Sequence, residues 1–317
     1  MRIIFLGSPN FAVTCLERLI ESGHDILCVI TQPDKPGNRG KITPPEVKVF
    51  AEKKGLTVYQ FPKIARDGVD IIKKLKPDIM ITAAYGQIIS QEIIDIPHFG
   101  IINVHASLLP KYRGASPVQS AIIAGEQVTG ITIMQTEAGL DTGDILAVRE
   151  LEIAGTETAG ELMDKLAVIG ADLLIETLDK IKHDDIKKVH QISEMATITT
   201  KIRKEDALIT FQKSALQIKN LILGTNPDPI SYCYLNGEPL KIYRARVAGE
   251  IESEENVVGM VLDCSSAKHG VFVQCGVGVL ELLEIQFPGG KVLPAKTLMG
   301  GRKINVGDVL QGRIKEE

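Results

Sequence analysis

The stretch GIINVHASLLPKYRG, residues 100–114, contains a short apolar run that passes into a polar loop. The run GIINV, bounded by a glycine and by the proline-containing loop, has the pattern of a buried strand. Because side chains two apart in a strand leave the same face, Asn103 and His105 are predicted to point together at the end of that strand. In an open α/β sheet, ligands bind beyond the carboxyl ends of the strands. The stretch therefore predicts a functional site on a sheet of this class.

Strand-like and helical patterns alternate from residue 1 to about residue 180, which predicts a Rossmann-like, doubly wound and mostly parallel sheet. The first strand leads into a helix that Ser8 is expected to cap, with Pro9 in its first turn. Further helices are expected at residues 45–55, 115–125 and 157–182. Strands are expected at residues 3–7, 25–31, 57–60, 78–84, 100–105, 129–137 and 144–151.

The second half of the chain has a different pattern, with a Thr- and Lys-rich linker expected at 193–206 and a helix near 213–223. Short β-rich runs separated by glycine-marked turns follow, which is typical of a small, OB-like antiparallel β-barrel. These runs are residues 240–247, 259–264, 270–275 and 277–287. We therefore expect a Rossmann-like domain at 1–192, the linker, and a β-barrel domain at 207–317.

Composition is that of a globular protein without a strongly basic surface. The 317 residues exceed what one core usually organises, and with a net charge of −4 any basic patch for a nucleic acid would have to be local. The five cysteines are odd in number and lack C-x-x-C spacing, so neither a disulfide framework nor a zinc site is expected. No apolar run has the length of a signal peptide or a membrane span. A cytoplasmic location is expected.

Common cofactor motifs are missing from the sequence. The first strand–helix turn, residues 7–12, lacks the G-x-G-x-x-G fingerprint, and no G-x-x-x-x-G-K-[ST] loop follows, which disfavours a nicotinamide or nucleoside-triphosphate enzyme. The six histidines form no H-x-x-x-H or H-E-x-x-H set, so no metal is expected.

A second candidate stretch is GLDTGD, residues 139–144, which follows a predicted strand. Asp and Gly are ordinary turn residues, so the stretch can be a structural connection. Alternatively, Asp141 is a carboxylate that faces His105 across the ends of neighbouring strands and favours protonation of the imidazole. For His105 itself, a structural role and a catalytic role remain open on the residues alone.

The two stretches together resemble the signature of the folate-dependent formyltransferases. The matching residues are Asn103, His105, Ser107 to Pro110, Lys111, Arg113, Gly114, and Leu140 to Asp144. Residues 31–41 further resemble the basic insertion of the methionyl-tRNA formyltransferases, and the similarity continues through residues 226–247. The chain differs from that group at residues 226–231, where the group has a tryptophan, because this sequence contains none.

The resemblance implies transfer of a formyl group from 10-formyltetrahydrofolate to the amino group of methionine on initiator tRNA. It implies that Asn103 and a protonated His105 donate hydrogen bonds to the formyl oxygen, while Asp141 orients His105 and assists proton transfer. It makes the first domain catalytic and the β-barrel a tRNA-binding domain.

The resemblance also implies the binding residues. The folate-binding residues are expected to be Ser107, Leu108, Leu109, Pro110, Gly139, Leu140, Thr142, Gly143 and Asp144. The tRNA-binding residues are expected to be Lys35, Arg39, Lys41 and Lys201. The Leu109–Pro110 bond is expected to be cis, and the protein is expected to be a monomer without a metal or a membrane partner.

Three other functions remain open. An amino-sugar N-formyltransferase would share the three catalytic residues, and a formyltetrahydrofolate hydrolase would use water as the acceptor. A catalytically silent RNA-binding protein would use only its barrel. The basic insertion and the second domain favour a tRNA acceptor.

Overall fold

The computed structural model describes residues 1–36, 42–248, 257–264, 269–300 and 303–312. The chain forms two compact units. Unit 1 comprises Met1–Pro117, Val128–Glu152 and Met163–Thr199. Unit 2 comprises Val118–Gln127, Ile153–Leu162 and Thr200–Glu317.

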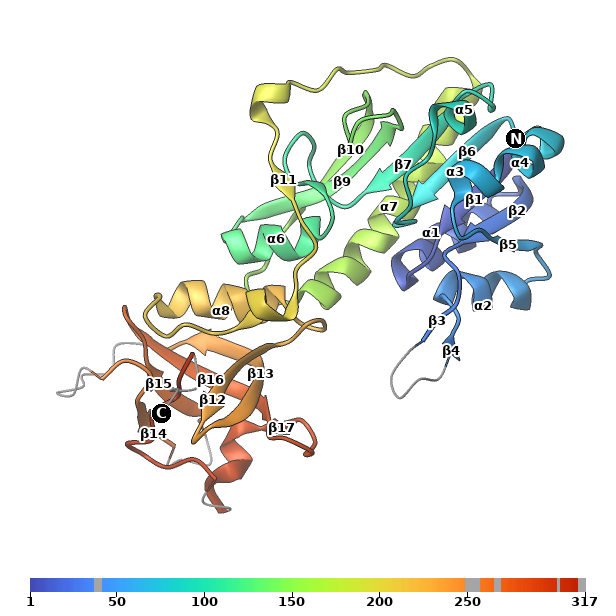
Figure 1. Cartoon of the computed structure of the whole chain (residues 1–317). Helices are drawn as coiled ribbons and strands as arrows, with labels where there is room; N and C mark the ends of the chain where they lie inside the picture. Colours follow the sequence, from blue (N-terminus) through green and yellow to red (C-terminus); the bar gives the residue numbers. More distant parts are fainter. Residues whose placement is uncertain (37–41, 249–256, 265–268, 301–302, 313–317) are drawn as a thin grey trace. The chain divides into compact units, whose positions relative to one another are not determined.

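Unit 1 is built on a seven-stranded, mostly parallel sheet, as the alternating pattern predicts (Figure 1). In spatial order its strands are β10 (Ile145–Glu152), β9 (Val128–Gln135), β7 (Ile101–His105), β6 (Ile79–Ala83), β1 (Arg2–Gly7), β2 (Asp25–Thr31) and β5 (Val58–Gln60). The strands from β5 to β7 are parallel, whereas β9 runs antiparallel to both β7 and β10. The chain order reverses at β1, which makes the sheet doubly wound and places the switch point between β1 and β6.

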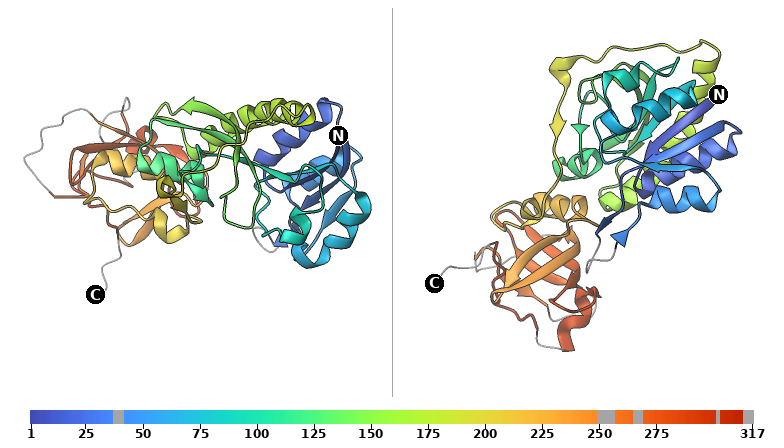
Figure 2. Two further views of the ribbon diagram at one scale, coloured as in Figure 1. Left: turned by 90° about the horizontal axis from the view of Figure 1, so that it is seen from above. Right: turned by 45° about the vertical axis from the view of Figure 1, so that its right-hand side comes forward.

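Helices cover both faces of this sheet (Figures 1 and 2). They are α1 (Asn10–Glu21), α2 (Glu46–Lys53), α3 (Ile64–Asp67), α4 (Val69–Leu75), α5 (Gln91–Ile94) and the part of α7 (Ala159–Lys182) that belongs to unit 1. An ion pair of 2.9 Å between Arg18 and Asp172 places α1 beside α7. The prediction that Ser8 caps α1 is wrong. Pro9 occupies the N-cap position, and the Ser8 hydroxyl instead accepts a hydrogen bond from the Gln32 backbone.

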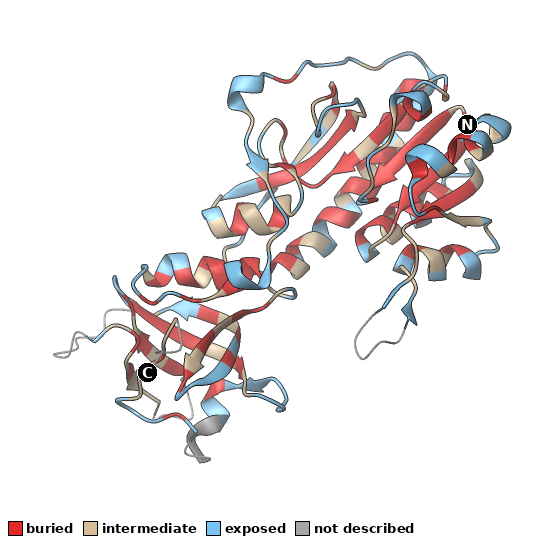
Figure 3. Ribbon diagram, in the orientation of Figure 1, coloured by how far each residue is buried: buried red, intermediate tan, exposed pale blue. Residues whose placement is uncertain are grey.

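The central strands β1, β6 and β7 are largely buried because both faces are covered, which explains their continuous apolar runs (Figure 3). On one face, Ile4 and Leu6 of β1 belong to a cluster with residues of α3, α4 and α5. On the other face, α7 comes so close that a side chain at Gly170 would lie 3.0 Å from Val104 and 3.3 Å from Ile131. Asn103 and His105 share the face of Ile101, which belongs to the α3–α5 cluster.

Unit 2 contains an antiparallel sheet that confirms the predicted β-rich domain. Its path is β12 (Ser231–Leu235), β13 (Glu238–Val247), β16 (Val279–Gln286), β15 (Val271–Gln274) and β14 (Val261–Asp263), with β17 (Leu293–Pro294) paired to β16. Bridges join Gln311 to Tyr234 on one edge strand, and Val309 to Met260 next to the other. One segment thereby links both edges and curls the sheet into a small barrel. The helices α6 (Pro117–Ala124) and α8 (Ala215–Gly224) complete this unit, with the Ser214 side chain capping α8.

Candidate active site

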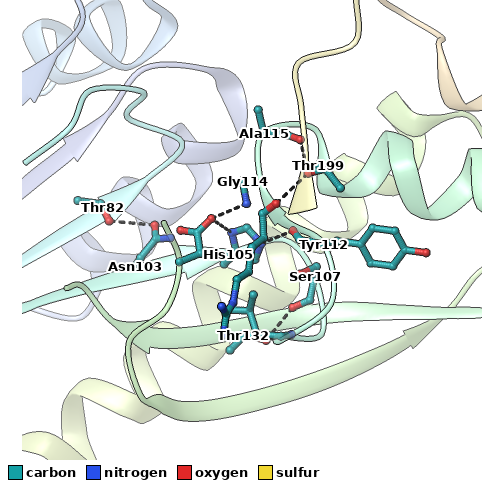
Figure 4. A network of polar contacts seen from close by, with 12 residues as sticks. Thr82, Asn103, His105, Ser107, Tyr112, Gly114, Ala115, Thr132 and Thr199 are labelled. Carbon is teal, nitrogen blue, oxygen red and sulfur yellow. Dashed lines mark hydrogen bonds and ion pairs between the residues drawn. The ribbon is translucent and has the colours of Figure 1, made fainter. Parts of the chain in front are cut away.

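Asn103 lies in β7, beside Thr82 of the neighbouring strand β6. The Thr82 hydroxyl donates a hydrogen bond of 2.9 Å to the side-chain oxygen of Asn103 (Figure 4). Because the oxygen accepts this bond, the amide nitrogen of Asn103 is directed elsewhere with both of its hydrogens. The side chain is half-buried, so the amide is held in place while remaining accessible. Asn103 is therefore a preset hydrogen-bond donor.

His105 is almost fully buried, with 6% of its surface exposed, and its ring is fixed by the loop that follows. Its Nε2 lies 3.0 Å from the carbonyl oxygen of Tyr112 (Figure 4). A carbonyl can only accept, so Nε2 bears a proton and donates it. The nitrogen that remains for other chemistry is Nδ1.

Nδ1 of His105 faces Asp141, at 3.7 Å from the carboxylate oxygen Oδ2. That distance is an ion-pair contact rather than a hydrogen bond. The same Oδ2 accepts a hydrogen bond of 2.7 Å from the Gly114 backbone, which fixes the carboxylate beside the ring. The structure thus brings the two stretches together at a pair of titratable side chains.

Asp141 was expected to face His105 across the ends of neighbouring strands, but the chain brings it there differently. Because β9 is antiparallel, Gln135 at its end pairs with Ile102, and Thr132 pairs with His105. The turn therefore leaves the sheet near the amino end of β7 and folds back toward His105. The two residues do not meet across the carboxyl ends of neighbouring strands.

Residues 107–110 form a tight turn after β7, and the Leu109–Pro110 bond is cis as predicted. Ser107 is fully buried and its hydroxyl donates a hydrogen bond of 2.8 Å to the Lys111 carbonyl oxygen. The Thr132 hydroxyl donates to the Ser107 carbonyl oxygen at 2.7 Å and accepts from the Leu109 backbone at 3.1 Å. Ser107 therefore shapes the turn, whereas Leu108 and Pro110 are partly exposed.

The 139–144 turn contains an exposed side chain as well as groups that are buried or hydrogen-bonded within the protein. Leu140 is 58% exposed, whereas Gly143 is buried against the Gln135 backbone. Thr142 lies against Gly139, and the Asp144 carboxylate contacts Nδ1 of His190 at 3.1 Å. The carbonyl oxygens of Asp141 and Gly143 accept hydrogen bonds from the buried side chain of Gln191. Some of the backbone groups of this turn are thus already used within the protein.

The predicted tRNA-binding residues are only partly described. Lys35 is exposed and lies in β3 (Lys35–Pro36), which pairs with β4 (Ile42–Thr43) in a short hairpin. Arg39 and Lys41 lie outside the described residues. Lys201 is exposed and belongs to unit 2.

The base of the β3–β4 hairpin is anchored by Asp34, Lys48 and Gln60. Lys48 donates to the Asp34 carboxylate at 2.8 Å and 3.0 Å, and Gln60 donates to it at 2.8 Å. These hydrogen bonds, from Lys48 first and then from Gln60, lower the pKa of the Asp34 carboxyl. Asp34 precedes the hairpin and Lys48 follows it, so the bonds tie its two ends together.

Sequence reasoning missed Thr82, Tyr112 and Gln191. Thr82 is one of several apolar or small residues in a buried strand, and Tyr112 contributes only its backbone carbonyl to His105. Gln191 acts on residues about 50 positions earlier. Contacts between distant segments leave no motif within any one stretch of the sequence.

Within the described residues, no group of three or more His, Cys, Asp or Glu side chains is arranged to hold a metal ion. Among the helices of the described part of the chain, none combines the length and apolarity needed to cross a membrane. All five cysteines are unpaired, as the sequence predicts.

The site occurs in a chain with many similar proteins. Residues 1–178 match the family described as Formyl transferase, and residues 201–303 match its C-terminal domain. A methionyl-tRNA formyltransferase of Acetivibrio thermocellus is 45% identical over 312 residues, covering 98% of this chain and 99% of that protein.

Solved structures of lower identity share the fold. HypX from Aquifex aeolicus, in complex with tetrahydrofolic acid, has a TM-score of 0.66 at 16% identity, over 95% of this chain and 47% of that one. WlaRD, a sugar 3N-formyl transferase, has a TM-score of 0.66 at 19% identity, over 92% of this chain and 99% of that one. The two matched regions and the full-length identity agree. The chain therefore belongs to the formyl transferase family, among the methionyl-tRNA formyltransferases.

Proposed function

We propose that the protein transfers the formyl group of 10-formyltetrahydrofolate to the free amino group of methionyl-initiator tRNA, giving N-formylmethionyl-tRNA. The observation that carries the reaction type is the convergence of the Asn103 amide, the His105 imidazole and the Asp141 carboxylate. The acceptor is supported by the 45% identity to a methionyl-tRNA formyltransferase, which extends through both halves of the chain.

A folate donor fits the surroundings of these three residues. Leu140 is 58% exposed on the turn that holds Asp141, and Ile88 is 87% exposed just after β6, the strand next to β7. Such apolar side chains suit a flat ring system. Two proteins of this fold were solved with tetrahydrofolic acid and with 5-N-formyl-THF. When bound, the folate supplies the formyl group.

We propose that the folate is held by the partly exposed residues of the two turns. These are Leu108, Pro110, Gly139, Leu140, Thr142 and Asp144, with Ser107, Leu109 and Gly143 supporting the two turns from buried positions. Because Gln191 already binds the carbonyl oxygens of Asp141 and Gly143, hydrogen bonds to the ligand would come from other backbone groups.

The role of Asn103 is to donate a hydrogen bond to the formyl oxygen. Negative charge develops on this oxygen as the amine attacks, and a preset donor stabilises that charge without reorganising. The hydrogen bond from Thr82 keeps the amide nitrogen, not the oxygen, on the side of the reaction.

The role of His105 is exerted through Nδ1, because Nε2 is bonded to Tyr112. Nδ1 is therefore the nitrogen from which His105 donates to the formyl oxygen, and the Asp141 carboxylate, 3.7 Å away, orients the ring. The attacking amine must lose a proton as the new C–N bond forms. The Asp141 carboxylate accepts that proton and returns it to the folate nitrogen that leaves.

The test compares three acceptors for the formyl group: charged initiator tRNA, a dTDP-linked amino sugar, and water. With 10-formyltetrahydrofolate present, we expect the purified protein to formylate charged initiator tRNA, and to leave a dTDP-linked amino sugar unmodified. Release of formate without either acceptor would identify a hydrolase instead. Formylation of the sugar nucleotide alone would overturn the proposed acceptor.

We propose that Lys35, Arg39, Lys41 and Lys201 contact the tRNA, and that the unit containing the barrel provides a tRNA-binding surface. We expect Arg39→Ala to weaken productive use of the tRNA strongly and to leave folate binding intact, since guanidinium groups bind phosphates and base edges bidentately. Arg39→Lys should also be impaired. The logarithmic salt dependence of tRNA binding should fall by about one unit for each lost phosphate contact.

The control for Arg39 is Arg66→Ala, which removes another arginine of unit 1, one paired with Asp67 at 2.6 Å. This control should keep the tRNA kinetics of the wild type. Equal kinetics and equal salt dependence for both variants would show that Arg39 takes no part in tRNA binding. We further propose that the protein acts in the cytoplasm as a monomer and needs no metal.

A further inference from the structure

Gln191 is a buried side chain whose hydrogen-bonding groups are all engaged. It follows α7, is 3% exposed, and has no place in the sequence motifs of the site. Its Nε2 donates to the carbonyl oxygens of Asp141 at 2.9 Å and Gly143 at 2.7 Å. Its Oε1 accepts from Nε of Arg113 at 3.0 Å and from Nη2 at 2.8 Å. Carbonyls only accept and a guanidinium only donates, so the orientation of this amide is determined.

These four hydrogen bonds connect the two turns of the active site. Arg113, itself 7% exposed, precedes Gly114, whose N–H donates to the Asp141 carboxylate at 2.7 Å. Gln191 therefore holds the backbone of Asp141 directly, and through Arg113 it holds the loop that fixes the carboxylate. The backbone carbonyl of Asp141 is thus held by Gln191 directly, and its carboxylate is held indirectly, through Arg113 and Gly114.

Asp141 needs such support because its backbone is in the left-handed region, at φ 50°. A residue with a Cβ atom rarely adopts this conformation and keeps it only where surrounding contacts determine it. The hydrogen bond from Gln191 to the Asp141 carbonyl is one of those contacts. Without it, the turn is free to relax away from His105.

We propose that Gln191 is the positioning residue for Asp141. This inference rests on the proposed function, because it assigns Gln191 to the same reaction. Gln191 does not touch the reacting groups. It determines where the Asp141 carboxylate lies relative to Nδ1 of His105.

The substitution Gln191→Glu tests the amide nitrogen of Gln191 separately from its oxygen. It keeps an oxygen for Arg113, but it places a second oxygen against the two carbonyl oxygens of the turn. We expect the variant to fold, to bind folate and charged tRNA with nearly unchanged KM values, and to lose kcat by roughly a hundredfold, the effect of a catalytic group displaced by about 1 Å. Gln191→Asn, which keeps a neutral amide one methylene shorter, should also lose kcat, which excludes an effect of the new charge alone.

The matched control is Gln135→Glu. The Gln135 amide nitrogen likewise lies against two backbone carbonyls, those of Phe99 at 3.4 Å and Ile101 at 3.2 Å, at the opposite end of β7. Gln135→Glu likewise places an oxygen against two carbonyl oxygens, and we expect this variant to keep its kcat. A double-mutant cycle adds a readout that a purely structural role would not change. In an Asp141→Asn background, Gln191→Glu should cost little further activity.

The outcomes distinguish this inference from the proposed function. If the wild type does not formylate charged tRNA, the proposed function fails. If the wild type is active and Asp141→Asn is impaired, but Gln191→Glu keeps a wild-type kcat, only the positioning role is overturned. An equal loss from Gln191→Glu in the wild-type and Asp141→Asn backgrounds overturns it as well. If Gln191→Glu does not fold, the same cycle with Gln191→Asn decides.

Discussion

Replacement of His105 by alanine is expected to remove most formyl transfer, with a loss of at least about a hundredfold to a thousandfold in kcat. The variant loses the Nδ1 group that faces Asp141 at 3.7 Å, and with it the proposed hydrogen-bond donor to the formyl oxygen. Asp141→Asn alone should also reduce kcat severely. The double variant should be only slightly worse than His105→Ala, because residues that act as one unit show strongly non-additive losses.

Steady-state kinetics of the two single variants and the double variant measure this coupling. Thermal unfolding provides the control, because His105 is buried and its removal deletes the hydrogen bond to the Tyr112 carbonyl. Multiplicative losses in folded protein would mean that His105 and Asp141 act independently. The proposed pair would then be incorrect even if each residue mattered alone.

Asn103→Asp is expected to have the second-largest effect, about a hundredfold or more in kcat. The substitution keeps the shape of the side chain and the acceptor for Thr82, but it replaces the amide donor with an oxygen. An oxygen repels the charge that develops on the formyl oxygen. We expect KM for the tRNA to change little, which separates loss of stabilisation from loss of binding. A variant with wild-type kcat would remove Asn103 from the reaction.

Thr82→Val should produce a smaller version of the same defect. Valine has the shape of threonine but cannot hold the Asn103 oxygen, so the amide is free to rotate. A lost hydrogen bond of about 1 kcal/mol corresponds to roughly a fivefold decrease in kcat. Thr82→Ser keeps the hydroxyl and should restore the rate. If serine and valine behave alike, Thr82 contributes packing rather than orientation.

The architecture of unit 1 was predictable because its strands have long apolar runs that local patterns reveal. The predicted run 25–31 coincides with β2, and 100–105 differs from β7 by one residue. The short helices α3 and α5 were not predicted, since four residues give no helical periodicity. Nor does an apolar run reveal the direction of its strand. The antiparallel course of β9 is fixed by its pairing with β7 and β10.

The candidate site was predictable where its residues share one stretch. Asn103 and His105 follow from strand alternation, and the contact with Asp141 was suggested by resemblance to known proteins. The residues that orient these three could not be predicted, because their hydrogen bonds come from other segments. Thr82 acts across two paired strands, and Gln191 acts across about 50 residues of intervening chain. Nothing in the sequence around Thr82 or Gln191 marks them, and only their contacts in the folded protein reveal their role.

The contacts made by residues 189–199 bear on when the protein becomes active during its synthesis. Gln191 binds the turn of Asp141, and Thr197 and Thr199 bind the loop of residues 112–115. These hydrogen bonds join positions 48 to 86 residues apart in the chain. Folding on the ribosome proceeds from the N-terminus, so the sheet from β1 to β10 can assemble first. When Asn103, His105 and Asp141 have emerged from the ribosome, we expect the nascent chain to be still inactive. It should become active only after the segment ending at Thr199 has also emerged and has formed its hydrogen bonds with the two turns.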